Sequence, residues 1–208
     1  MHKLIINKLG PIDHCELTCN DFMIFTGFQS SGKSTIAKAI FYFRTIKNDI
    51  YKIIEDYIFG TATSANNGGI SLKKELVNTL KSKFLRTFGS SWGMDNQMSL
   101  EYRYTNDCFV KIYLKPDLYY QTPNYIWIEL SDSIQDFLFK YTMSITEFTD
   151  GSKKAIKEAL AKLFNDNQEI VYIPAGRSML TLLSQQLNYI YSTMDDLQKR
   201  TIDYCTQN

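Results

Sequence analysis

Residues 27–34 of the chain read Gly-Phe-Gln-Ser-Ser-Gly-Lys-Ser, and Thr35 follows directly. The two glycines, the lysine and the last serine occupy every fixed position of the pattern G-x-x-x-x-G-K-[ST]. Glycine at positions 27 and 32 lets the backbone turn sharply and approach an anion without a Cβ atom in the way. The amide N–H groups of such a turn can point inward together and surround phosphate oxygens. The pattern therefore predicts a phosphate-binding loop, and it limits the fold to those that can present one.

The residues around the loop support this prediction, because a phosphate-binding loop lies between a strand and a helix. Residues 21–26 form a short apolar, β-prone run that ends at Gly27, as a buried strand would. From Ser34 onward, apolar residues recur with helical spacing, and this spacing continues to about Phe59. The sequence therefore predicts a strand over 21–26 and one long helix after the loop. The alternative is a turn rich in glycine and serine that contains a lysine by chance.

The polar residues of the loop each have an expected role on a nucleoside triphosphate. Lys33 is expected to reach the β- and γ-phosphates, and the Ser34 hydroxyl to ligate Mg²⁺. Thr35 is expected to support the α-phosphate. The sequence predicts ATP and Mg²⁺ as ligands, although it does not fix ATP over GTP, and it identifies no catalytic residue. The expected nucleotide-binding residues are Gly27, Phe28, Gln29, Ser30, Ser31, Gly32, Lys33, Ser34, Thr35 and Arg177.

Length and composition are those of an ordinary globular chain. It has 208 residues, of which 44% are apolar, enough for one domain or for one domain with an insertion. Lysine and arginine number 23 and aspartate and glutamate 22, so the net charge of +1 gives no overall electrostatic reason to expect nucleic acid. No apolar run is long enough to span a membrane, and the start of the chain is too short and too polar for a signal peptide. The four cysteines lack metal-site spacing, so we expect reduced thiols. Together these features predict a cytoplasmic protein without membrane contact.

Short strands and amphipathic helices are expected along the rest of the chain. Two strands precede the predicted strand over 21–26, so a small antiparallel sheet is expected before the loop. Residues 72–88 form a basic amphipathic helix candidate, for which a solvated face is favoured over a surface for nucleic acid or a partner. The other predicted elements are strands over 3–6, 15–18, 98–105, 108–114, 125–130 and 169–173, and helices over 133–141 and 153–164.

Together these features resemble the N-terminal half of an ABC-type ATPase head, in the chromosome-maintenance, recombination-ATPase and overcoming-lysogenization-defect groups. Residues 4–12 are similar to the first strand and turn of such heads, and residues 171–178 to a strand end often written Y-I-P-A-x-R-S. Loops of these groups usually read G-x-N-G-S-G-K-S-T, from which this chain departs at Gln29 and Ser30. Glycine is usual at position 30 because the backbone there needs a positive φ, so Ser30 is expected to be less comfortable.

The resemblance covers residues 1–45 and 168–180. It implies an α/β P-loop NTPase fold, with an antiparallel β subdomain and a helical insertion, as an incomplete head. We expect one domain over 1–208, in which 60–131 form a diverged insertion or β subdomain and 177–208 form a C-terminal helix that could lead into a coiled coil. The implied partners are ATP, the C-terminal half of the same head and a second head that completes a dimer. DNA is a further candidate partner.

Three features of these groups are missing from the sequence. No apolar strand ends in Asp-Glu, the pair that would bind Mg²⁺ and activate water, and residues 125–129 are the nearest approach. An ordinary strand with a surface Glu129 is favoured there. A signature of the L-S-G-G-Q type and a later switch histidine are also missing. Two accounts stay open: the chain is the first half of a longer protein, or it is a degenerate domain that binds nucleotide without hydrolysis.

The leading functional hypothesis is the ATP-binding part of an ABC-type, chromosome-maintenance-like ATPase that couples ATP binding to the handling of DNA or a partner protein. Hydrolysis would need the missing half and a second head, so little turnover is expected. One alternative is a nucleotide-gated interaction module without chemistry. A P-loop kinase is a weaker alternative, since no arginine-rich lid follows the loop. Arg177 is expected either to contact nucleotide or the facing head, or to pair with a local carboxylate at a helix start.

Overall fold

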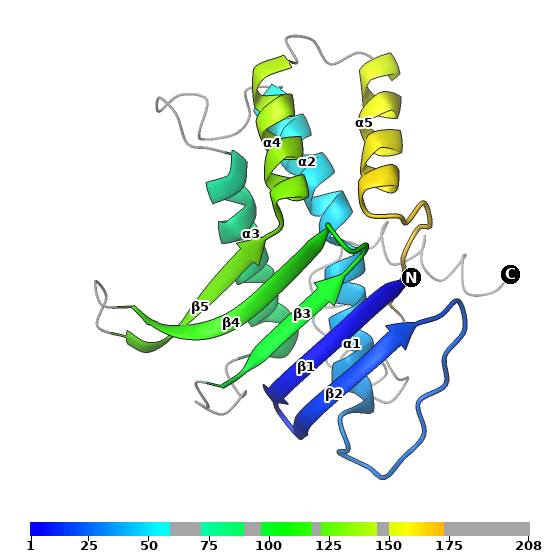
Figure 1. Ribbon diagram of the computed structural model, residues 1–208, viewed down its shortest axis with the longest axis vertical. Helices are drawn as coiled ribbons and strands as arrows, with labels where there is room; N and C mark the ends of the chain where they lie inside the picture. The colour runs from blue at the N-terminus through cyan, green and yellow to red at the C-terminus, as the bar shows by residue number, and fades with distance from the viewer. Residues whose placement is uncertain (59–71, 90–96, 118–121, 145–149, 173–208) are drawn as a thin grey trace, which may run out of the picture. The chain divides into compact units, whose positions relative to one another are not determined.

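The computed structural model describes residues 1–58, 72–89, 97–117, 122–144 and 150–172. The chain divides into two compact units, Met1–Ile170 and Val171–Asn208, and every helix and strand of the described residues belongs to the first. These elements make the fold α/β, as the sequence predicts (Figure 1). The strands are β1 (His2–Leu9), β2 (Ile12–Cys19), β3 (Ser99–Arg103), β4 (Phe109–Asp117) and β5 (Thr122–Leu130). The helices are α1 (Lys33–Arg44), α2 (Ile46–Ile58), α3 (Leu72–Phe88), α4 (Asp132–Ser144) and α5 (Asp150–Leu163).

These strands form one antiparallel sheet in the order β2-β1-β3-β4-β5. β1 and β2 form an N-terminal hairpin, in which Leu9 pairs with Ile12 across the turn, in agreement with the antiparallel pairing predicted before the loop. Gly10 sits in that turn with a φ of 57°, a conformation that glycine adopts without strain. The other edge of β1 pairs with β3. The β-rich region that starts near residue 98 therefore continues the N-terminal hairpin as one sheet.

The strand predicted over 21–26 does not form, because these residues have no strand partner in the described part of the chain. Phe22 and Ile24 are 80% and 72% exposed, although both are large apolar side chains. The strand predicted over 169–173 is likewise not formed in its described part, residues 169–172. A strand needs a neighbour to take up its backbone hydrogen bonds, and apolar residues alone do not supply one.

The long helix predicted after the loop is divided into α1 and α2 at Thr45. The Thr45 hydroxyl donates to the carbonyl groups of Phe41 at 2.7 Å and Tyr42 at 3.0 Å. Hydroxyl side chains that bond back to the preceding helical turn tend to bend a helix. The same hydroxyl accepts a hydrogen bond from Lys83 of α3 at 2.8 Å, so the break is held from both sides.

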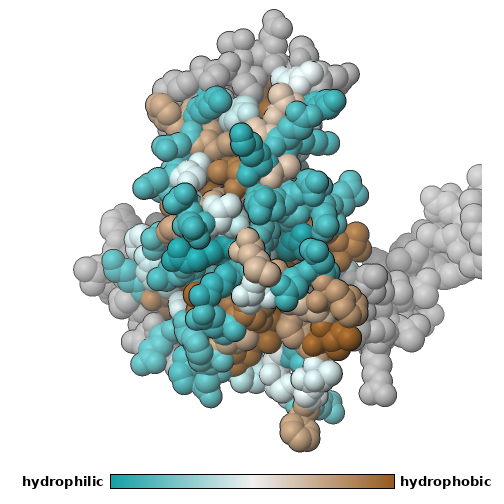
Figure 2. Space-filling view, turned by 45° about the vertical axis from the view of Figure 1, so that its right-hand side comes forward, coloured by the Kyte–Doolittle hydropathy of each residue, from teal (hydrophilic) through white to brown (hydrophobic). Residues whose placement is uncertain are grey.

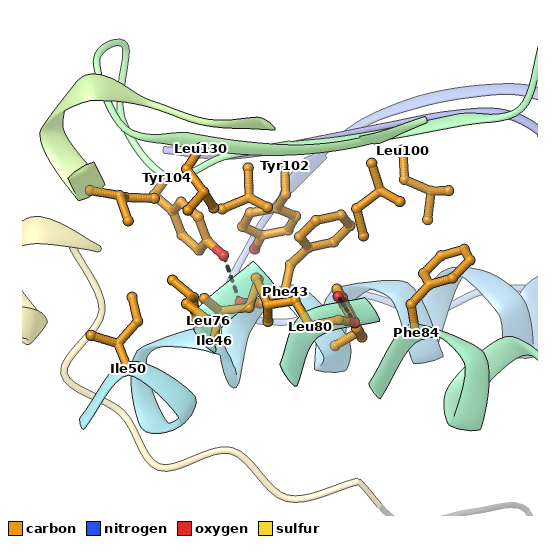
Figure 3. Close-up of a cluster of buried hydrophobic side chains, with 14 of the residues drawn as sticks. Phe43, Ile46, Ile50, Leu76, Leu80, Phe84, Leu100, Tyr102, Tyr104 and Leu130 are labelled. Atoms are coloured by element: carbon orange, nitrogen blue, oxygen red, sulfur yellow. Dashed lines mark hydrogen bonds between the residues drawn. The ribbon is translucent and has the colours of Figure 1, made fainter. Parts of the chain in front are cut away.

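The core lies between the sheet and the helices α1, α2 and α3 (Figure 3). Phe43 of α1 stacks on Tyr102 of β3, with ring centroids 5.3 Å apart and planes 16° from parallel. The Tyr104 hydroxyl donates to the Phe43 carbonyl at 2.6 Å, which satisfies a phenol that is completely buried. The Tyr42 hydroxyl similarly donates to the Leu80 carbonyl at 2.8 Å. Aromatic rings thus fill the centre of the core, and their polar ends bond to helix backbone rather than to water.

The basic helix predicted over residues 72–88 forms as α3. Its basic side chains do not make one solvated face, because some of them contact other elements. The Lys83 ammonium forms an ion pair with Asp49 of α2. The Lys81 ammonium donates to the Tyr125 hydroxyl of β5 at 3.1 Å. Leucine and phenylalanine at every fourth position form the buried stripe of this helix: Leu72, Leu76, Leu80 and Phe84.

A buried ionic cluster fixes the segment after α5 against the junction of α1 and α2. The Asp166 carboxylate accepts the Arg44 Nε–H at 2.9 Å and lies 3.2 Å from the Lys47 ammonium. The same ammonium donates to the main-chain carbonyl groups of Asp166 at 2.9 Å and Gln168 at 2.6 Å. Asp166 and Lys47 are both buried, and a lone charge would be costly to remove from water. The carboxylate and the ammonium therefore stabilise each other.

His2 also bonds to the segment that follows α5. Its Nε2 lies 3.1 Å from the Phe164 carbonyl, which can only accept, so the ring proton belongs on Nε2. Its Nδ1 then accepts from the Tyr102 hydroxyl at 3.0 Å. Burial lowers the pKa of His2 below its usual 6.5, which keeps the ring neutral and preserves both bonds.

Candidate phosphate-binding site

The loop over residues 27–32 leads from the segment after β2 into α1. Its backbone turns back on itself, with the Ser31 N–H 3.4 Å from the Phe28 carbonyl oxygen. Gly32 is the N-cap residue of α1, with φ 93° and ψ 3°, and its carbonyl accepts the Ile36 N–H at 2.9 Å. The helix therefore begins at Lys33, directly where the sequence pattern ends.

The two pattern glycines have the backbone freedom that the sequence predicts they need. Gly27 has a φ of 145° and Gly32 a φ of 93°, values that residues with a Cβ atom rarely adopt. A Cβ atom at Gly32 would also lie 2.6 Å from Cγ1 of Ile12, in the β1–β2 hairpin. The loop thus packs directly on the hairpin, and only glycine fits at the contact.

The position expected to need a positive φ has one, since Ser30 lies at a φ of 63°. Serine replaces the glycine that is usual at this position in the resembling ATPase groups. A left-handed conformation costs a residue with a Cβ roughly 1–2 kcal/mol. The loop keeps this shape in spite of the cost, which indicates that its neighbours determine the backbone path.

Lys33 lies across its own loop. Its ammonium donates to the Gly27 carbonyl at 2.7 Å, to the Phe28 carbonyl, and to the Ser31 hydroxyl at 3.2 Å. Three oxygen atoms of the loop therefore hold the Lys33 ammonium beside the turn. An anion that enters there would meet this ammonium first and would compete with the carbonyl groups for its protons.

The loop and the hairpin turn together line a cavity of about 500 Å³. Its lining residues are Pro11, Gln29, Ser30, Ser31, Gly32, Lys33, Ser34 and Thr35. Of the expected nucleotide-binding residues, Gly27 and Phe28 do not line it, and Phe28 is 91% exposed. Arg177 lies outside the described residues. Pro11 also lines the cavity and Ile12 contacts Gly32, although neither is among the expected nucleotide-binding residues. Their one signal in the sequence was the Gly-Pro turn, and only the fold brings that turn next to the loop.

The N-terminal end of α1 adds positive potential to this cavity. The first amide N–H groups of a helix have no partner inside it, and Gly32 has no side chain to cap them. No acidic residue lies in the first turn of α1, so nothing there opposes the positive end of the helix dipole. Lys33 contributes a full positive charge beside these amides. The arrangement suits a ligand with several negatively charged oxygens.

Among the residues that the structure describes, those that line the cavity include no carboxylate. Residues 125–129, the nearest approach in the sequence to an Asp-Glu strand end, lie in β5, and Glu129 pairs across the sheet with Lys111. β5 and β2 are opposite edges of the sheet, and the loop packs on the turn next to β2 (Figure 1). Glu129 is thus an ordinary strand residue in this structure. Across the described ranges, no group of three or more histidine, cysteine, aspartate or glutamate residues could hold a metal ion.

A second polar cavity, of about 470 Å³, lies at the other end of α1, beside Arg44 and Asp166. Two of its charged groups are already paired, because Arg44 bonds to Asp166 and also donates to the Gln168 side-chain oxygen at 3.4 Å. It has neither left-handed glycines nor a helix N-terminus in its lining. The anion-binding features are therefore found at the loop cavity, whereas the ionic cluster has a structural role.

Comparisons with known protein-family models, curated proteins and solved structures find no match to this chain. None of the helices in the described ranges has the length and apolar character needed to cross a membrane.

Proposed function

We propose that this chain binds ATP together with Mg²⁺ at the loop over residues 27–35. The observation that carries the proposal is the left-handed Gly32 at the start of α1. It brings the loop, the uncapped amides of the helix and the Lys33 ammonium around one cavity. Backbone donors, a helix N-terminus and a lysine together match the several anionic oxygens of a triphosphate.

In the bound state, each polar residue of the loop has a separate task. Lys33 leaves its carbonyl partners and binds the β- and γ-phosphates. The Ser34 hydroxyl, which is exposed beside the cavity, ligates Mg²⁺, and Thr35 supports the α-phosphate. Magnesium takes most of its other ligands from phosphate oxygens and water.

We further propose that the chain acts as one part of an ABC-type ATPase head and hydrolyses ATP slowly or not at all by itself. Two observations support this part of the proposal. The cavity lining has no carboxylate that could orient a water. The apolar side chains of Phe22 and Ile24, directly before the loop, are exposed in a segment that has no strand neighbour among the described residues. Figure 2 shows hydrophobic residues, in brown, gathered at the lower right of the surface in that view.

Binding of a fluorescent ATP analogue with Mg²⁺ tests the site. Loss of Lys33 removes a charge-assisted hydrogen bond of about 1.5–3 kcal/mol, so Lys33→Ala should weaken binding at least tenfold. Lys38→Ala is the matched control, because it removes the same charge from α1 at a residue that does not line the cavity. Equal affinity for the two variants would contradict the proposed site.

Phosphate release, measured on the same samples, tests for turnover. Binding without release, with or without DNA, fits both a part of an ATPase head and a nucleotide-gated interaction module. Release that DNA stimulates and that Lys33→Ala abolishes favours an ATPase. The lack of a carboxylate in the lining makes slow release the expected result for the isolated chain.

A further inference from the structure

One face of the sheet carries aromatic rings and cations in place of core side chains. Along β4, buried aliphatic residues alternate with residues that point to the opposite face. On that face, the register sets Tyr113 opposite Trp127 and Lys115 opposite Tyr125. Figure 1 looks onto this side, with α1 and α3 behind the strands. We call these side chains the outer platform: Arg103, Lys111, Tyr113, Lys115, Tyr125 and Trp127.

Trp127 is the centre of the outer platform. It is 37% exposed, and two ammonium groups lie near its ring, Lys115 at 5.4 Å and Lys81 at 5.9 Å from the centroid. The Tyr125 ring lies 6.0 Å away at 70°, and Lys81 also stands 4.2 Å above that ring. Lys81 comes from α3, which packs along β5. Two elements thus place cations next to one exposed indole ring.

The charge of this surface is unevenly distributed. At one end, Glu101 pairs with Arg103 at 2.6 Å and lies 3.8 Å from Lys111, and Glu129 stands opposite Lys111 in the register, so two cations and two carboxylates balance locally. At the other end, Lys81 and Lys115 contact aromatic rings, and neither forms an ion pair with a carboxylate among the described residues. The Trp127 end of the platform is therefore positive as well as aromatic, although the whole chain is almost neutral.

We propose that the outer platform binds single-stranded nucleic acid. A base stacks on Trp127, and the phosphates on either side of it lie near Lys81 and Lys115. Exposed rings flanked by cations are the combination that binds strands of any sequence, because every base has a flat face and every nucleotide an anionic phosphate. Bases in a duplex are covered by their neighbours, and an acidic peptide has no flat ring to stack. Neither ligand would use both the rings and the cations of this surface. The platform is also separate from the proposed ATP site at residues 27–35.

Fluorescence anisotropy with a labelled oligothymidine of about twelve nucleotides tests this proposal on the full chain at low salt. A stacked base contributes about 1–3 kcal/mol, so Trp127→Ala should weaken binding roughly tenfold, and Trp127→Phe should recover most of the loss. Phe139→Ala is the matched control, because Phe139 is a 65% exposed ring on α4, away from the platform. Lys115→Ala should reduce the salt dependence by about 0.7 in log–log slope, and Lys154→Ala on α5 should not.

Three results would overturn the proposal. The first is no binding at low salt. The second is equal affinity for folded Trp127→Ala and Phe139→Ala. The third is competition by heparin, an anion without bases, that is as strong as competition by the unlabelled strand. Lys33→Ala should leave oligonucleotide affinity unchanged while it weakens ATP binding, so failure at one site is distinguishable from failure at the other.

Discussion

Ile12 lies so close to Gly32 that a Cβ atom added to the glycine would stand 2.6 Å from the Ile12 Cγ1 atom. The contact joins the β1–β2 hairpin to the loop over residues 27–32 at the residue where α1 begins. The hairpin thus determines how the loop is presented, and changes on either side of this contact should affect both stability and ligand binding.

The first prediction concerns this contact. Gly32→Ala combines a left-handed alanine with overpacking against Ile12, so we expect the free energy of unfolding to fall by about 2–4 kcal/mol in urea denaturation. Gly10→Ala is the matched control, because its φ is also positive, at 57°, and no atom lies within 4 Å of the added Cβ. It should lose only about 1–2 kcal/mol. Equal losses for the two variants would show that the hairpin contact is unimportant.

The second prediction concerns Ser30, whose φ of 63° disfavours a β-branched side chain. Ser30→Val should unfold at lower urea concentration than Ser30→Gly, with a difference of about 1–2 kcal/mol in the free energy of unfolding. ATP affinity should follow the same order, since the loop shape positions the amides. A valine variant as stable as the glycine variant would mean that the loop relaxes out of the left-handed conformation.

The third prediction concerns the buried ionic cluster. Asp166→Asn leaves the Lys47 and Arg44 charges without their carboxylate, and we expect the free energy of unfolding to fall by about 2–4 kcal/mol. Glu158→Gln on α5 removes a carboxylate from an exposed pair with Lys154 and should change stability by less than about 0.5 kcal/mol. If both variants lose the same amount, the cluster does not hold the segment after α5 in place.

The fourth prediction concerns pH. Burial lowers the pKa of His2 below its ordinary 6.5, with Asp166 opposing and Arg44 adding to the shift. The unfolded chain therefore takes up a proton at a pH where the folded chain does not, so stability is lost as pH falls below about 6.5. His2→Gln should lose less stability than the wild type between pH 7.5 and 5.

Urea denaturation at the two pH values measures this difference, and His14→Gln, on the exposed strand β2, serves as the control. His14→Gln should keep the pH dependence of the wild type. A wild-type chain that is equally stable at both pH values would contradict the buried, neutral state of His2.

Local features of the fold follow from the sequence more fully than long-range ones. The loop pattern predicts which residues need a positive φ. Glycine at positions 27 and 32, and the glycine that is usual at position 30, adopt a positive φ without steric cost. The hairpin and α3 follow from alternating and fourfold apolar spacing. Each of these patterns is complete within a few residues, so no distant partner is needed to interpret it.

The features that the sequence did not predict depend on contacts with distant residues, which the spacing of apolar residues does not reveal. Residues 21–26 have the composition of a strand, but pairing depends on a neighbour that a sequence window does not contain. The break at Thr45 depends on whether a hydroxyl bonds back to the helix. The contact of Ile12 with Gly32 and the burial of Lys47 beside Asp166 join residues far apart in the chain. Only the folded arrangement makes these pairs visible.

Calorimetric titration of the wild-type chain with ATP in Mg²⁺ tests the central claim most directly. We expect a saturable heat with about one ATP per chain, and loss of most of that heat in Lys33→Ala but not in Lys38→Ala. No heat from ATP or GTP at millimolar concentration, with the chain folded, would contradict a nucleotide site at this loop.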